Sequence, residues 1–410
     1  MDNINSTIPD TWELIKLGEI TTYTKGYAFK SINYISEGTR VIRISDTNAH
    51  SIKEENPIFI SNEDGQYDKW KLIENDLVFT TVGSKPPMYD SMVGKVIKVH
   101  KKQEGALLNQ NAVILRGLKS KVNQHYLYHN FKLKKYLNFI ETIVRGNANQ
   151  VSITLKELFN YVIPLPPLKE QQKIAEILSQ WGEAIETTQN LIEKLQLRKK
   201  GLMQELLSGK KRLAGFSEEW KRMNIGDVAT QFTDKNKDDE DIEVLSCTKY
   251  DGLVPSLQYF GRKVYGDDLS KYKIVPRGYF AYATNHIEEG SIGYQDIWDK
   301  GLVSPMYTVF KTNDSIDDSF FFRLLKTDRM IYSYQSNMSG SIARRGGLRW
   351  NVFETLIIKI PSYEEQVSIA NFFDKVDEEI ITASNQLENL KQQKKGLMQQ
   401  LLTGKKRVKI

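Results

Sequence analysis

The chain has 410 residues, of which 40% are hydrophobic and 26% charged, and its net charge of +6 permits nucleic-acid binding without requiring it. This length allows two to four domains, and no run approaches the roughly 18–20 apolar residues that a membrane span requires. The single cysteine, Cys247, excludes an internal disulfide and a cysteine-based zinc site, and without a secretory signal pattern we expect a cytoplasmic protein.

Residues 1–163 are expected to form a first domain of mixed α and β structure. Short β-branched and aromatic runs predict strands at 40–44, 76–80, 93–99 and 161–163. A helical stretch is predicted near 124–139, where His125 and His129 lie one turn apart. Two ligands are too few for a metal site, so we expect none.

A long helix is predicted within residues 164–212. Pro166-Pro167 precedes it, and Glu170 occupies the first turn, where a carboxylate meets the positive end of the helix dipole. Apolar or tolerant residues then recur at alternating steps of four and three, as at the a and d positions of a coiled coil. These positions are Ile174, Leu178, Trp181, Ile185, Thr188, Ile192, Leu195, Lys199, Leu202 and Leu206. Gly209 follows as a C-terminal stop.

Residues 213–358 are expected to form a second mixed domain. Its opening repeats that of the first domain, since Trp220 is followed by Ile-Gly-Asp-Val where Trp12 is followed by Leu-Gly-Glu-Ile. A strand is predicted at 306–310, a helical stretch near 319–331 and a closing strand at 356–358. Between their openings and closing strands the two domains diverge in sequence.

Residues 359–410 repeat the long helix. The segment 199–212 returns at 394–407 with only two substitutions, Glu205 to Gln400 and Ser208 to Thr403. The a and d positions return with a constant offset of 195, at Ile369, Phe373, Val376, Ile380, Ala383, Leu387, Leu390, Lys394, Leu397 and Leu401. Because the a and d positions of the two helices repeat in one register, the simplest interpretation is that the two helices pack against each other. We therefore expect an α+β chain in which two mixed domains are separated by two long helices, paired as an intramolecular antiparallel coiled coil with pseudo-twofold symmetry.

Polar, glycine-containing loops offer candidate DNA-binding residues in both domains. Arg, Asn and Gln side chains have the bidentate geometry that reads purine edges, and glycine lets the backbone approach closely. The candidates are Ser84, Lys85, Arg145, Asn147, Asn149 and Gln150 in the first domain, and Asn285, His286, Ser341, Arg344 and Arg345 in the second. A solvated surface loop is the alternative for any one of them. The Lys-Lys-Arg segments at 210–212 and 405–407 could contact phosphates, or instead satisfy helix C-terminal carbonyls.

The order of these segments resembles the specificity subunit of type I restriction-modification systems. The resemblance covers essentially the whole chain. It rests on Pro-x-x-x-Glu-Gln at 166–171 and 361–366, and on Gly-Leu-Met-Gln-x-Leu-Leu at 201–207 and 396–402. Only the first copy continues with a second proline.

The resemblance implies that each variable domain is a target recognition domain, which reads one half of a split, asymmetric sequence in double-stranded DNA. The helices would set the gap between the halves and dock two modification subunits, which carry S-adenosylmethionine and methylate adenine. Restriction subunits, which use ATP and Mg, would complete the complex in the cytoplasm of a bacterium or archaeon. The specificity subunit itself would bind no cofactor and catalyse nothing.

Two other functions remain open at this point. A self-contained methyltransferase-nuclease would need a cofactor loop, but Ser-Lys-Pro-Pro-Met-Tyr at 84–89 only faintly resembles the Asn-Pro-Pro-Tyr loop of adenine methyltransferases, and no Gly-rich loop precedes it. A non-catalytic adaptor would use the coiled coil to join partners without reading DNA.

Overall fold

The structure is a computed structural model that describes residues 8–48, 51–86, 88, 90–146, 151–237, 242–338 and 347–410. The chain divides into unit 1, Met1–Gln189 with Asn385–Ile410, and unit 2, Asn190–Ser384. The two divisions fall inside the two long helices, 195 positions apart, at the offset of the sequence repeat. Each unit therefore contains one mixed domain, the first half of one long helix and the second half of the other.

Unit 1 is built around a four-stranded antiparallel sheet of order β2-β9-β5-β7, with a three-stranded sheet β4-β3-β8 and the pairs β1-β11 and β6-β10 beside it. Its strands are β1 (Glu13–Lys16), β2 (Thr21–Lys25), β3 (Thr39–Ile42), β4 (Ile58–Ile60), β5 (Leu77–Thr80), β6 (Val82–Gly83), β7 (Val96–Lys98), β8 (Leu107–Leu108), β9 (Ala112–Gly117), β10 (Val151–Ser152) and β11 (Val162–Leu165). Its short helices are α1 (Leu17–Ile20), α2 (Gln124–Asn130), α3 (Lys134–Ile143) and α4 (Leu155–Leu158).

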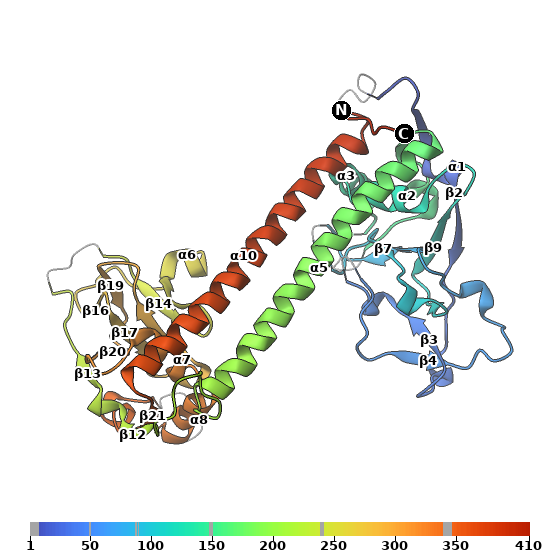
Figure 1. Cartoon of the computed structure of the whole chain (residues 1–410). Coiled ribbons are helices and arrows are strands. Elements are labelled where there is room, and N and C mark those ends of the chain that lie inside the picture. The colour runs from blue at the N-terminus through green and yellow to red at the C-terminus, as the bar shows by residue number, and fades with distance from the viewer. Residues whose placement is uncertain are drawn as a thin grey trace. The chain divides into compact units, whose positions relative to one another are not determined.

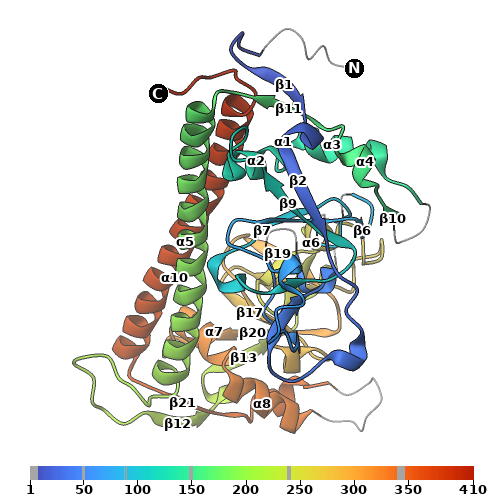
Figure 2. The ribbon, with the colours of Figure 1, turned by 90° about the vertical axis from the view of Figure 1, so that its right-hand side faces the viewer.

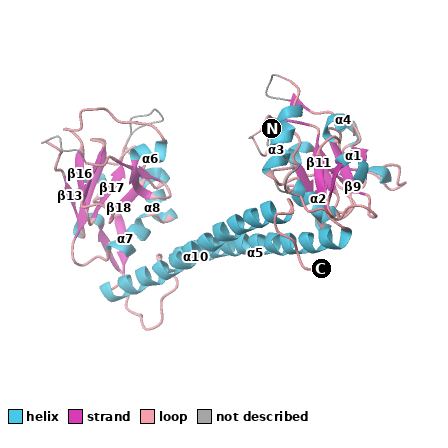
Figure 3. Cartoon of the chain, turned by 90° about the horizontal axis from the view of Figure 1, so that it is seen from above, coloured by secondary structure: helices cyan, strands magenta, loops and turns pink. Residues whose placement is uncertain are grey.

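Unit 2 has a four-stranded antiparallel sheet of order β13-β20-β17-β18 and the pairs β12-β21, β14-β15 and β16-β19. Its strands are β12 (Lys221–Asn224), β13 (Ala229–Phe232), β14 (Leu245–Thr248), β15 (Gly252–Pro255), β16 (Lys273–Pro276), β17 (Tyr279–Ala283), β18 (Ile292–Gln295), β19 (Lys300–Val303), β20 (Tyr307–Thr312) and β21 (Ile357–Ile360). Its short helices are α6 (Ser256–Phe260), α7 (Asp318–Leu325), α8 (Asp328–Asn337) and α9 (Trp350–Phe353). Figure 3 shows the strands of each unit in magenta with its helices in cyan.

The two domains share the order of their four-stranded sheets and the pairing of their first and last strands, although their sequences diverge. In each, the first strand of the domain pairs antiparallel with the last, β1 with β11 and β12 with β21. The next strand pairs with the last strand of the four-stranded sheet, β2 with β9 and β13 with β20. The prediction of two mixed α/β domains is confirmed.

The helical stretches predicted near 124–139 and 319–331 are each two helices rather than one. α2 and α3 are separated by a turn that ends at Leu133, whose ψ of 146° is extended. α7 and α8 are separated at Thr327, which is extended and caps α8 by accepting the Met330 N–H. Neither turn contains Gly or Pro, so the sequence carries no strong signal of the break.

The long helices are α5 (Leu168–Leu206) and α10 (Tyr363–Leu401), each of 39 residues, and both bounds repeat at the offset of 195. Figures 1 and 2 show the two helices side by side. In unit 1 the start of α5 lies beside the end of α10, and in unit 2 the start of α10 lies beside the end of α5, so the helices are antiparallel as predicted. Gly209 and Gly404 follow the helices with φ of +71° and +76°, which is the left-handed C-terminal stop that the sequence predicted.

The hydrophobic core of each unit includes residues from both long helices. In unit 1, Ile174 and Leu178 of α5 and Leu402, just after α10, are fully buried with the domain's own apolar side chains. In unit 2, Ile369 and Phe373 of α10 take the equivalent places. The helix ends are therefore part of each domain's core. Within the described residues, no helix combines the length and the hydropathy that a membrane crossing demands.

Candidate nucleic-acid interface and helix anchors

The fold brings together the two polar loops of unit 1 that the sequence singles out. β6, which precedes Ser84, pairs with β10, and the pairing continues to Arg145, whose N–H donates to the Ser152 carbonyl at 2.9 Å. β6 and Arg145 thus lie on either side of β10 in one small sheet, although they are far apart in sequence. Three further predicted residues lie outside the described residues: Asn147, Asn149 and Gln150.

An ion pair with Glu157 fixes the position of the Arg145 guanidinium, which remains exposed to solvent. Its Nη2 lies 2.6 Å from Glu157 Oε1, while 66% of the side chain is exposed. Hydrogen bonds from Thr154 and from Arg145 lower the pKa of the Glu157 carboxyl, so this partner is ionised at neutral pH. Lys85 is exposed as well. The two predicted cations of this loop pair are available to an anionic partner.

A polar hollow of about 540 Å³ opens beside Ser84. It is lined by residues from three separate segments of unit 1, namely Ile44, Ser45, Thr47, Lys53, Val82, Gly83, Ser84, Asp90, Ser91, Lys95 and Asn111. Most of its lining residues carry a hydroxyl, amide, ammonium or carboxylate group beside the apolar atoms of the wall, and such groups donate and accept hydrogen bonds at base edges and phosphates. Sequence reasoning singled out only the loop that contains Val82, Gly83 and Ser84, because only the fold brings the other segments beside it.

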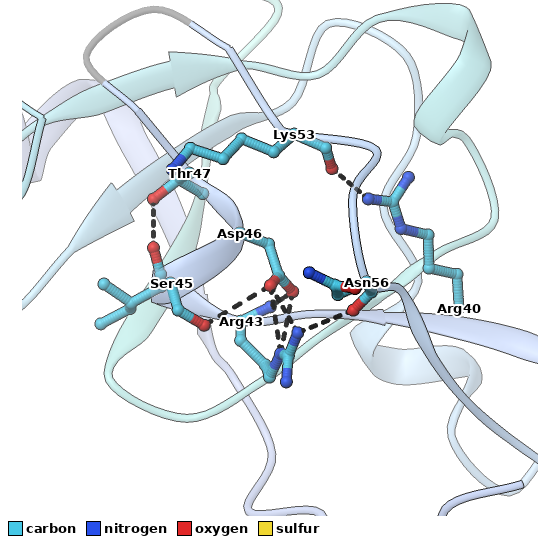
Figure 4. Close-up of polar contacts among 8 residues, drawn as sticks. Arg40, Arg43, Ser45, Asp46, Thr47, Lys53 and Asn56 are labelled. Carbon is cyan, nitrogen blue, oxygen red and sulfur yellow. Dashed lines mark hydrogen bonds and ion pairs between the residues drawn. The ribbon is translucent and has the colours of Figure 1, made fainter. Parts of the chain in front are cut away.

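Ion pairs and hydrogen bonds of Arg40 and Arg43 stabilise the segment that carries Lys53 at the edge of the polar hollow (Figure 4). Arg43 donates to both carboxylate oxygens of Asp46, with Nη2 2.7 Å from Oδ1, and also to the Asn56 carbonyl at 3.0 Å. Arg40 donates to the Lys53 carbonyl and to Glu54. The two arginines are therefore occupied within the loop, whereas the exposed Lys53 side chain is the cation that this wall presents.

In unit 2 the equivalent loops are joined in the same way. The Leu348 N–H donates to the Thr284 carbonyl at 2.8 Å, as the Ile153 N–H donates to the Thr81 carbonyl at 3.1 Å in unit 1. Asn285 follows at once, and its side chain is exposed, as is that of its neighbour His286. Three other predicted residues lie outside the described residues: Ser341, Arg344 and Arg345. That these side chains bind DNA remains a prediction.

A buried glutamate anchors the long helices in unit 1. Glu170, in the first turn of α5, is fully buried and accepts hydrogen bonds from Arg407 at 2.5 and 2.6 Å and from Trp12 Nε1 at 3.2 Å. The Arg407 guanidinium also lies 5.9 Å from the centre of the Trp12 ring. Because Arg407 follows α10, this contact ties the start of one helix to the end of the other and to the domain's first tryptophan.

Unit 2 contains the same anchor at the offset of 195. Glu365 is buried and accepts hydrogen bonds from Arg212 at 2.6 and 2.5 Å, and Arg212 lies 5.8 Å from the centre of the Trp220 ring. Hydrogen bonding to Glu365 raises the pKa of Arg212. The two copies differ, since no described residue bonds to the buried Trp220 Nε1 and since Arg212 Nη1 also donates to the Glu218 carbonyl at 2.8 Å.

The glutamine beside each glutamate ties the helix to a short helix of the domain. Gln171 Oε1 accepts the N–H of Asn123, the N-cap of α2, at 2.8 Å, and Gln366 Oε1 accepts the N–H of Asp317, the N-cap of α7, at 3.0 Å. Each glutamine also donates to the proline carbonyl that precedes its helix, at 2.8 Å in unit 1 and 3.2 Å in unit 2. We call Glu170, Gln171, Arg407 and Trp12, with their unit 2 equivalents, the helix anchors.

The helix anchors change the interpretation of both repeated motifs. The Glu-Gln pair was predicted only as a favourable first turn, and its carboxylates are instead buried ion-pair partners. Arg212 and Arg407 are engaged by those carboxylates, so any phosphate contact of the Lys-Lys-Arg segments falls to the exposed lysines. These are Lys210, Lys211, Lys405 and Lys406.

None of the predicted seam positions is exposed. The buried ones are Ile174, Leu178, Thr188, Ile192, Leu195, Leu206, Ile369, Phe373, Val376, Ala383, Leu387 and Leu401. The half-buried ones are Trp181, Ile185, Lys199, Leu202, Ile380, Leu390, Lys394 and Leu397. The two lysines differ in environment, because Lys199 forms an ion pair with Asp377 and Lys394 lies beside Gly182.

Comparison with known proteins places the chain in a family. A profile described as the type I restriction modification DNA specificity domain matches twice, at residues 9–197 and 217–392. The putative type I restriction enzyme MjaX specificity subunit of Methanocaldococcus jannaschii is 27% identical over 98% of this chain and 95% of its own length. The MjaVIII specificity subunit of the same organism is 26% identical over 98% and 94%.

A solved structure shares the fold. The S subunit of a type I restriction-modification system from M. genitalium superposes with a TM-score of 0.60 at 15% identity, over 98% of both chains. The repeat, the two unlike domains and the two profile matches coincide along the chain. The chain belongs to the family of type I restriction-modification specificity subunits, and it carries two DNA specificity domains.

Proposed function

We propose that this chain reads a split and asymmetric target in double-stranded DNA, one half with each domain. The observation that carries the proposal is that matching helix anchors are combined with unlike loops. Both units fasten their domain to the helices through the same Glu-Gln-Arg-Trp set, whereas the equivalent loops carry different side chains, Ser84 and Lys85 in unit 1 and Asn285 and His286 in unit 2. An attachment that is repeated in both units, combined with two different surfaces, suits two different half-sites.

We propose further that the long helices dock two modification subunits, which supply S-adenosylmethionine and methylate adenine, and that restriction subunits join them with ATP and Mg. The exposed faces of α5 and α10 support this assignment, because they carry apolar side chains off the seam, at Leu191, Leu197 and Ile381. In this scheme the chain contributes recognition and no catalysis, and it acts on DNA in the cytoplasm.

The test is to co-express the chain with its modification subunit and to sequence the host genome for N6-methyladenine. We expect methylation at a two-part motif with unlike halves and a fixed gap, and none when the chain is omitted. A single palindromic motif would contradict the assignment of the halves to two unlike domains. A folded complex that adds no methylation would favour the adaptor, which joins partners without reading DNA.

A glycine substitution tests the role of the polar hollow. A Cβ added at Gly83 would lie 2.3 Å from the Ser91 carbonyl oxygen and 2.6 Å from the Val93 nitrogen, so one of these backbone segments has to move. We expect Gly83→Ala to weaken binding to the cognate duplex by tenfold or more, measured by fluorescence anisotropy on the complex with the modification subunit. Gly266→Ala is the control, since nothing lies within 4 Å of its added Cβ and its φ is not positive. Equal affinities of the two variants would exclude the hollow from the DNA interface.

A further inference from the structure

Unit 1 contains a second cavity, apart from the polar hollow, where its domain meets the last turns of α10. It has a volume of about 500 Å³ and is lined by Met92, Lys95, Val96, Tyr128, His129, Phe131, Lys132, Tyr136, Leu137, Lys394 and Met398. Cavities of this volume hold small molecules in many proteins. We call it the α10 cavity. Its walls combine aromatic and thioether side chains with cationic ones, and its lining contains no carboxylate.

The basic side chains of the α10 cavity lie close enough to shift one another's pKa, and His129 is neutral at pH 7. Burial first, and then the charges of Lys394, Lys98, His125 and Lys132, lower the pKa of His129 to about 3. Burial and Lys394 lower the pKa of Lys132 to about 8. Lys132 donates to the Val96 carbonyl at 2.7 Å, and Lys95 donates to the Thr47 carbonyl at 3.0 Å. Backbone carbonyls thus accept hydrogen bonds from both lysines, and the charge of Asp90 also acts on Lys95.

Among the residues that the structure describes, His129 has no hydrogen-bond partner. Its side chain is 3% exposed and lines the cavity, and neither Nδ1 nor Nε2 has a donor or acceptor in range. A buried imidazole without a partner costs free energy, because its hydrogen bonds to water are lost without replacement. Such a group at a cavity wall is explained if a ligand supplies the missing bond.

In unit 2, carboxylates neutralise the corresponding basic side chains. Lys199, the repeat equivalent of Lys394, forms an ion pair with Asp377, and Arg323 contacts Asp374 at 2.7 Å and Asp377 at 3.2 Å. Arg323 and His129 lie at the same distance from the N-caps of α7 and α2. The repeat places Gly182 where unit 2 has Asp377, and a Cβ added there would be 3.0 Å from Lys394 Nζ. Unit 1 has kept the lysine and lacks its carboxylate.

We propose that the α10 cavity binds a small organic anion, with its phosphate or carboxylate group near Lys394, Lys132 and His129 and an apolar ring against Phe131 and Met398. The anion supplies the charge that Asp377 supplies in unit 2. A nucleoside monophosphate has both parts. This assignment is independent of DNA reading, because the cavity is separate from the polar hollow, with Lys95 in the wall between them.

The test titrates AMP, adenosine and inorganic phosphate into the full chain by isothermal calorimetry. We expect AMP to bind, phosphate to bind more weakly and adenosine not to bind. Lys394→Met should weaken AMP binding tenfold or more. Lys395→Met, at the exposed neighbour on the same helix, should leave it unchanged.

Gly182→Asp provides a variant that keeps the fold. It copies the unit 2 pairing, and the only atom near the new Cβ is the flexible end of Lys394, so we expect an unchanged or higher melting temperature together with the loss of AMP binding. No heat from AMP or phosphate, equal binding of adenosine and AMP, or unchanged AMP binding in both Lys394→Met and Gly182→Asp would overturn the proposal. The first of these outcomes, combined with impaired assembly of Gly182→Asp with the modification subunit, would assign the cavity to a partner's carboxylate instead.

Discussion

Replacing Glu365 with alanine is expected to destabilise unit 2 by about 3 kcal/mol. The carboxylate is 1% exposed and its partner Arg212 is 23% exposed, so the substitution leaves a largely buried guanidinium without its counter-ion. Arg212 then either keeps an uncompensated charge beside Trp220 or moves into water and gives up its contact with that ring. Both outcomes loosen the start of α10 from the end of α5 within unit 2.

The measurement is hydrogen exchange followed by mass spectrometry, because a chain of two units does not guarantee one cooperative transition. Amides of β21 and the first turns of α10 should exchange faster in Glu365→Ala, while those of unit 1 keep their protection. Glu364→Ala is the matched control, since it removes an exposed carboxylate from the neighbouring position. If both variants exchange alike, the buried ion pair does not hold the helix.

Inserting one heptad into both long helices is expected to lengthen the gap between the DNA half-sites by about three base pairs. Seven residues add about 10 Å of helix, and duplex DNA rises about 3.4 Å per base pair. The boundaries after Gln189 and after Ser384 are equivalent in the repeat, so insertions there keep the four-three spacing of both seams. The half-sites themselves should stay unchanged, because the residues of both domains are untouched.

Sequencing of N6-methyladenine in cells that express the insertion variant with the modification subunit gives the new gap directly. An insertion in α5 alone is the control. It shifts one seam against the other by a heptad and should abolish methylation rather than alter the gap. A double insertion that methylates with the original gap would show that the helices do not set the spacing.

The two long helices and their ends were predictable because they depend on residues that are close together in the sequence. The four-three spacing predicted two helices in one register, and their antiparallel pairing followed from the symmetry of the repeat. The glycine stops at Gly209 and Gly404 were predictable because positive φ is a property of a single residue.

The helix anchors were not predictable in the same way. A glutamate in a first turn is already explained by the helix dipole, so nothing near Glu170 points to a partner 237 residues later. The polar hollow is similar, because Ser45, Ser91 and Asn111 are ordinary loop residues until the sheets bring their segments together. Contacts of this kind depend on the tertiary fold, and a single sequence holds no record of them.

The interleaved division of the chain has a consequence for its synthesis. Every residue of unit 2 leaves the ribosome before residues 385–410, which complete unit 1, so the middle of the chain can fold while the unit begun first still waits for its last segment. Until then the side of the first half of α5 that faces α10 is uncovered, and Glu170 is without Arg407. Residues 385–410 thus complete the core of unit 1. A nascent chain that stalls shortly before them would contain a folded unit 2 and a unit 1 whose core is partly exposed.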